Sequence, residues 1–149
     1  MNEIIEQSQN TLIQIILANT TSAMKISSTL CEHSEGNIMK PDDIICGLIY
    51  RLMVPMTDEE ITESMNTAED IMYDGSTSEE EDLEVEVVDD MEDLKIQRKI
   101  QANNCNCVIC SQVRVCLCNF NEYIPKDELG DKFKKSILDT CKSYNKIIQ

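Results

Sequence analysis

The stretch NIMKPDDI, residues 37–44, joins two apolar-patterned segments and decides how the first third of the chain folds. Pro41 suits the first turn of a helix, because that turn needs no N–H from it and its fixed φ is already helical. Asp42 and Asp43 fall in the same turn, where carboxylates meet the positive end of the helix dipole. The stretch therefore predicts a turn and a helix start, and residues 37–39 leave room for one very short strand.

Apolar side chains repeat at helical spacing before this turn. Six of the eight positions of a three-then-four repeat are apolar: Ile5, Leu12, Ile16, Ala23, Ile26 and Leu30. This stripe predicts one amphipathic helix of about 45 Å, at roughly 1.5 Å per residue. Gly36 is expected to end it in a left-handed conformation.

Two shorter helices are expected after the turn. The second has an apolar face made of Ile44, Ile45, Leu48, Ile49 and Leu52, and it ends at the Val54-Pro55 pair. A capping box, Thr57 to Glu60, predicts the start of a third.

The order of a long helix, residues 37–39 and a short helix opened by residues 39–44 resembles the second half of the histone fold. That family carries a hydrophobic-x-Pro-x-Asp-Ile type of segment at this junction, and LCEH, residues 30–33, resembles the end of its long central helix. The resemblance covers residues 5–53. The chain departs from the family in having only a handful of residues before the long helix. An unrelated helical hairpin is the alternative.

The resemblance implies pairing with a second histone fold, because a long helix flanked by short ones cannot cover its own stripe. Residues 1–73 would form this module and dimerise with a copy or another chain. The expected interface consists of Ile5, Leu12, Ile16, Ala23, Ile26, Leu30, Ile44 and Leu48. DNA wrapping is not expected, because residues 1–57 hold only three basic side chains and phosphate binding needs many.

Charge divides the chain, whose net charge is −15, into three parts. Residues 58–93 carry seventeen carboxylates and no Lys or Arg, whereas residues 94–149 carry ten basic and five acidic residues. Residues 74–94 are predicted to be a disordered acidic linker, since like charges repel and apolar area is scarce. The linker could bind a basic protein such as a histone, or the chain's own basic end. VEVVDD, residues 85–90, resembles a SUMO-interacting motif.

Ser76, Thr77 and Ser78 each precede an acidic residue by three positions. This pattern resembles the acidophilic casein kinase type of site, so all three are predicted phosphorylation sites. Each phosphate would add about −1.5 to −2 charges.

Residues 104–118, NCNCVICSQVRVCLC, hold five of the eight cysteines. The pair Cys107 and Cys110 can present two sulfurs to one ion from a tight turn, with Cys105 beside them. Because no second C-x2-C follows, Cys141 on the apolar face of a last helix is the expected fourth ligand, and zinc the expected metal. The alternative is a set of reduced structural thiols. His33 is expected to be a solvated residue near a helix end.

Redox catalysis by Cys107 and Cys110 would need a βαβ pattern, which the sequence lacks. No apolar run reaches the roughly 20 residues of a membrane span, and the acidic N-terminus does not fit a signal peptide. An intracellular protein of the nucleus or cytoplasm is therefore expected. Abundant Ile and Asn suit an A+T-rich genome such as that of a large DNA virus, in which case the virion or viral factory applies.

The sequence thus predicts a mostly α chain: a histone-fold-like module, an acidic linker and a cysteine-rich, mildly basic helical module at residues 95–149. The expected function is a non-enzymatic interaction protein of transcription or chromatin that dimerises and recruits basic or chromatin-associated partners. The alternative is a zinc-binding, nucleic-acid-associated factor whose acidic linker masks the basic end. A net charge of +5 over residues 94–149 would permit only weak nucleic-acid contact.

Overall fold

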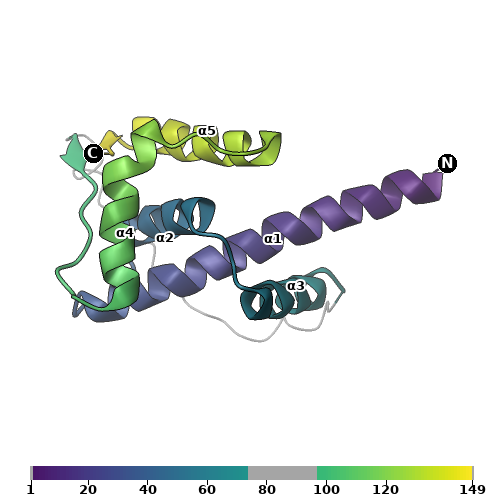
Figure 1. Cartoon of the computed structure of the whole chain (residues 1–149), viewed down its shortest axis with the longest axis horizontal. Helices are drawn as coiled ribbons and strands as arrows, with labels where there is room; N and C mark the ends of the chain where they lie inside the picture. Colours follow the sequence, from purple (N-terminus) through teal and green to yellow (C-terminus); the bar gives the residue numbers. More distant parts are fainter. Residues whose placement is uncertain (1, 74–96, 149) are drawn as a thin grey trace. The chain divides into compact units, whose positions relative to one another are not determined.

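The computed structural model describes residues 2–73 and 97–148, and within these ranges the chain is mostly helical, as predicted (Figure 1). The α-helices are α1 (Asn2–His33), α2 (Pro41–Met53), α3 (Asp58–Tyr73), α4 (Val108–Asn119) and α5 (Glu128–Ser143). The 3-10 turn η3 (Phe120–Glu122) follows α4, and the short strands β1 (Arg98–Lys99) and β2 (Lys146–Ile147) pair in parallel. None of the helices in these ranges combines the length and apolarity that crossing a bilayer demands.

Some predictions fall on other residues. The whole of the predicted acidic linker, residues 74–94, lies outside the described residues, as does the motif at residues 85–90. The predicted phosphorylation sites Ser76, Thr77 and Ser78 also lie outside them. These predictions stand untested.

The stretch at residues 37–44 joins α1 to α2, and Pro41 is the first residue of α2, as predicted. The Asp43 carboxylate accepts a hydrogen bond from the Lys40 backbone N–H at 3.0 Å, which satisfies a donor at the helix start. Residues 37–39 form bends and a coil position rather than the predicted short strand. A strand needs a hydrogen-bonding neighbour, and in the described part of the chain β1 and β2 pair only with each other.

The turn that ends α1 differs in one detail from the prediction. Glu35, with a φ of 59°, takes the left-handed conformation expected of Gly36. The Gly36 N–H donates to Cys31 O and the Glu35 N–H to Glu32 O, both at 3.3 Å. These two bonds form a Schellman motif with Glu35 in the position that glycine usually takes.

The described residues divide into two compact units, one made of residues 2–22 and 56–73 and the other of residues 23–55 and 97–148. This division differs from the predicted modules, because the end of α1 and the whole of α2 belong with the cysteine-rich region. We call the two parts the N-terminal unit and the core unit.

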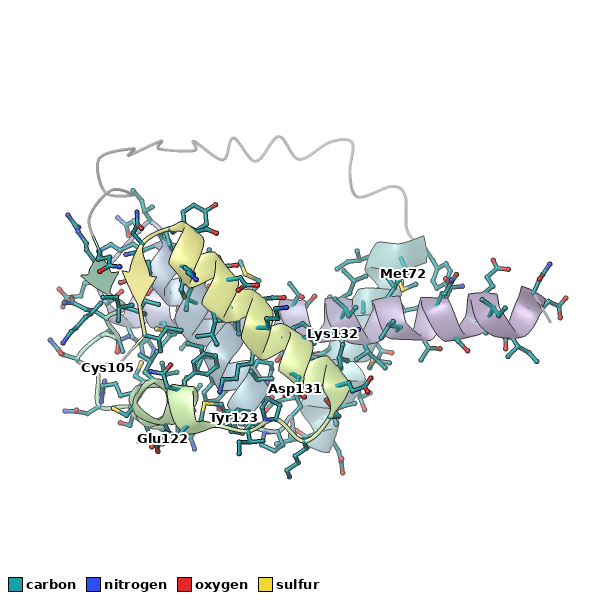
Figure 2. The ribbon with its side chains drawn as sticks, turned by 90° about the horizontal axis from the view of Figure 1, so that it is seen from above. Met72, Cys105, Glu122, Tyr123, Asp131 and Lys132 are labelled. Atoms are coloured by element: carbon teal, nitrogen blue, oxygen red, sulfur yellow. The ribbon has the colours of Figure 1, made fainter. Side chains whose placement is uncertain are left out.

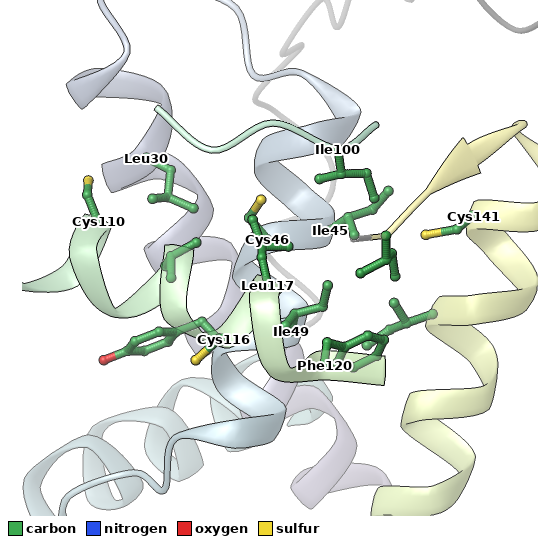
Figure 3. Close-up of a cluster of buried hydrophobic side chains, with 14 residues drawn as sticks. Leu30, Ile45, Cys46, Ile49, Ile100, Cys110, Cys116, Leu117, Phe120 and Cys141 are labelled. Atoms are coloured by element: carbon green, nitrogen blue, oxygen red, sulfur yellow. The ribbon is translucent and has the colours of Figure 1, made fainter. Parts of the chain in front are cut away.

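The core unit has one continuous apolar core, shown in Figure 3. Helices α4 and α5 both pack on α2 (Figure 1). Every helix of the unit contributes to the core; examples are Leu30 from α1, Ile49 from α2, Val113 from α4 and Ile137 from α5. Removal of these side chains from water provides the main force that holds the end of α1 against the cysteine-rich region.

Small residues allow α1 and α2 to cross closely within the core unit. A Cβ placed on Gly47 would lie 2.5 Å from Ala23 O and would also collide with Ser27 Oγ. The buried Ser27 hydroxyl donates to Ala23 O at 2.9 Å, so it needs no other partner there. This crossing fixes the last turns of α1.

The N-terminal unit is held together by small buried residues, among them Ala18 in α1 and Ser64 and Ala68 in α3. Gln14 Nε2 donates to Met65 O at 3.1 Å, which ties the two helices. The Glu60 N–H donates to Thr57 Oγ1 at 3.2 Å, so Thr57 caps α3 as predicted.

Candidate metal centre

Four potential ligands gather in the core unit, where α1 ends and α4 begins. His33 Nδ1 lies 3.4 Å from Cys105 Sγ, 3.3 Å from Cys107 Sγ and 3.4 Å from Cys110 Sγ. The four ligand atoms all lie within 4.8 Å of one another. A tetrahedron with metal–sulfur bonds of about 2.3 Å and a metal–nitrogen bond of about 2.0 Å has edges of roughly 3.6 Å. The group could therefore hold a metal ion.

Local backbone structure positions each of these side chains. His33 is the last residue of α1, and Cys105 lies on the segment that leads into α4 (Figure 2). Cys107 caps α4, with its Sγ accepting the Cys110 N–H at 3.4 Å. The Cys107 N–H in turn points to Cys105 Sγ at 3.5 Å. This is the tight turn that the C-x2-C spacing predicts.

Asn103 links the cysteine segment to α1. Its Nδ2 donates to Leu30 O at 3.1 Å and to Cys110 Sγ at 3.3 Å. Its Oδ1 accepts the Cys105 N–H at 3.3 Å. Each of the three sulfurs thus receives one N–H donor, and such donors around a ligand favour the thiolate form that binds metal.

The electrostatics of the sulfurs differ. The hydrogen bond from the Cys110 backbone N–H lowers the pKa of Cys107 to about 6, and bonds from the neighbouring side chains add to this effect. Burial raises the pKa of Cys110 to about 11. In the metal-free chain at pH 7, negative charge therefore gathers on Cys107, which prepares the group for a cation.

The structure brings Cys105, Cys107 and Cys110 together as predicted, but it does not bring Cys141 to them. Cys141 is 3% exposed within the core, and Figure 3 shows Cys110 and Cys141 on opposite sides of that core. His33 supplies the fourth potential ligand instead. It is exposed at the end of α1, as predicted, but its approach to the cysteines was not predicted. The signal for a missing ligand was present, since a Cys triad without a second pair still needs one more donor.

Three buried cysteines away from this group, Cys46, Cys116 and Cys141, fit the structural-thiol alternative. Burial, with help from Asp42, raises the pKa of Cys46 to about 12. Burial also raises the pKa of Cys116 and of Cys141. Neutral thiols of this kind behave as small apolar core residues.

The predicted dimer interface is split between the two units. Within the stripe of α1, exposure is 57% at Ile5, 46% at Leu12 and 37% at Ile16, but only 1% at Ala23 and 2% at Leu30. The other predicted members, Ile26, Ile44 and Leu48, are half-buried in the core unit. The second half of the stripe is thus covered by the chain's own core, and the first half is open to solvent.

The described residues therefore include two candidate functional features: a group of four potential metal ligands and an exposed apolar stripe on α1. Comparison with protein-family models, with curated proteins and with solved structures gives no match to the chain.

Proposed function

We propose that this chain is a non-enzymatic interaction protein, in which a structural zinc ion stabilises the core unit and the open half of α1 binds a partner. The observation that carries the proposal is the change in exposure along one stripe, from buried at Leu30 and Ala23 to largely exposed at Leu12 and Ile5. A helix face of this kind is stable in water when a second surface covers it.

Zinc is the metal that best fits the donors. Three thiolates and one imidazole in a tetrahedron are a common structural zinc set, whereas iron–sulfur clusters are usually held by four thiolates. All four positions would be taken by protein side chains, which leaves none for substrate or water. A closed site supports a structural role rather than catalysis.

The resemblance to the second half of the histone fold supports the mode of pairing. The long α1, the turn at residues 37–40 and the Pro41 start of α2 agree with it, while the lack of a strand at residues 37–39 does not. On this proposal, α1 pairs with a helix of another chain or of a copy, and the complex recruits basic or chromatin-associated proteins.

The experiment measures stripe-dependent association of the full-length, zinc-loaded chain. Sedimentation equilibrium would follow self-association, and fluorescence anisotropy would follow binding of a labelled amphipathic helical peptide. The test variant is I5Q/L12Q/I16Q; its matched control, I38Q/V115Q/I124Q, changes three other exposed apolar residues that lie in the core unit. We expect the test variant to lose association and the control variant to keep it. Absence of both kinds of association would overturn the proposal.

A second candidate, the zinc-binding nucleic-acid factor, is supported by one pocket of about 500 Å³ in the core unit. Lys99, Gln101, Asn104 and Arg114 line it, and these are donor side chains that suit phosphate oxygens. Duplex DNA binding by the full chain should then weaken steeply with salt. Lys99→Glu should reduce it more than Lys126→Glu, an exposed lysine outside the pocket. Equal effects of the two changes would contradict this candidate.

A further inference from the structure

We infer that the partner of the open stripe is a basic amphipathic helix of another protein. The open stripe is the face of α1 formed by Ile5, Leu12 and Ile16. This inference rests on the proposed function and adds the chemistry of the partner.

The open stripe has the spacing and length of a row that binds a second helix. Ile5, Leu12 and Ile16 are spaced seven and four residues apart, so they form one row along α1. The row continues directly into Ala23 and Leu30, which the chain's own core covers. The uncovered part extends over roughly 16 Å, about three helical turns. An apolar row of this length accepts the matching row of a second helix by interdigitation of side chains.

Charge around the stripe decides what kind of helix fits. The described residues of the N-terminal unit include eight carboxylates and no Lys, Arg or His. The carboxylates are Glu3, Glu6, Asp58, Glu59, Glu60, Glu63, Glu69 and Asp70, and all but Glu60 are exposed. A partner with Lys and Arg beside its apolar row would meet opposite charge, which speeds association and excludes wrong partners.

The same charges argue against a second copy as the occupant. Two copies joined through the open stripe would bring two wholly acidic units together, and like charges across an interface are unfavourable. The repulsion is weaker where salt screens it, with a screening length of about 8 Å at physiological ionic strength. A basic helix from another protein has no such cost.

Three synthetic helices of about four turns provide the test. They share one apolar row, and their polar faces carry Lys, Gln or Glu. Each is labelled and titrated with the full-length, zinc-loaded chain. We expect the Lys helix to bind roughly tenfold or more tightly than the Gln helix, and the Glu helix to bind least. Raising the NaCl concentration should weaken binding of the Lys helix much more than binding of the Gln helix.

Variants separate the apolar from the charged contribution. I5Q/L12Q/I16Q should abolish binding of the Lys helix, whereas I38Q/V115Q/I124Q should leave it unchanged. E3Q/E6Q should weaken binding of the Lys helix and leave binding of the Gln helix unchanged.

The outcomes distinguish this inference from the proposed function. If the Gln helix or a second copy occupies the open stripe as tightly as the Lys helix, the inference fails and the proposed function stands. If the Lys helix binds I5Q/L12Q/I16Q as well as the original chain, the contact is charge alone and the inference fails. If no helix and no copy binds, both fail together.

Discussion

Replacing His33 with alanine is expected to remove the link that a bound metal makes between the end of α1 and the segment that leads into α4. His33 and Cys105 are 72 residues apart in the chain. Joining points this far apart restricts the unfolded chain, and the loop-closure relation gives about 4 kcal/mol for such a loop. In His33→Ala the three cysteines that remain lie within residues 105–110, so a metal held there would close no long loop. The metal-dependent part of the free energy of unfolding should therefore fall by about 4 kcal/mol.

Urea unfolding followed by the helical circular dichroism signal measures this quantity. Each protein would be unfolded once with zinc and once with a chelator, under reducing conditions. His33→Cys is the matched control, because a fourth thiolate restores a common zinc set, and it should keep most of the increment. If His33→Ala kept the whole increment, or if the chelator had no effect on the original chain, the reasoning would be refuted.

Three further predictions concern single residues of the core unit. Gly47→Ala should destabilise the chain by about 2 kcal/mol in urea unfolding, because its Cβ would lie 2.5 Å from Ala23 O and overpacking outweighs the gain in helix propensity; an unchanged midpoint would contradict the close crossing. Glu35→Gly should raise stability by about 1 kcal/mol, since glycine tolerates the left-handed φ of 59°, and Glu35→Ala should show no such gain by the same measurement. Asn103→Ala should weaken zinc affinity by roughly 10–100-fold in a chelator competition, whereas substitution of the exposed Asn104 by Ala should leave it unchanged. Equal affinities of the two variants would show that the hydrogen bond from Asn103 to Cys110 does not support metal binding.

Local signals in the sequence predicted the local parts of the structure. Pro41 starts α2 and Thr57 caps α3 because the reasons for their positions lie within one helical turn. The cysteines at positions 105, 107 and 110 converge for the same reason, since their backbone hydrogen bonds stay within a six-residue segment.

Long-range pairing could not be read in this way. The approach of His33 to the cysteines depends on the packing of α1, α2 and α4 in one core, and no spacing rule reaches across 72 residues. Cys141 lies on the apolar face of α5, which suits a core thiol as well as a ligand, so the sequence pattern did not separate the two. The exposure of Ile5 beside the burial of Leu30 is likewise a property of the folded chain.

Native mass spectrometry of the full-length chain purified in the presence of zinc tests the central claim, a four-ligand zinc centre, most directly. The account predicts one zinc ion per chain, retained in Cys141→Ser and lost in His33→Ala and Cys107→Ser. A chain that carries no zinc, or one that loses it in Cys141→Ser and keeps it in His33→Ala, would contradict the account.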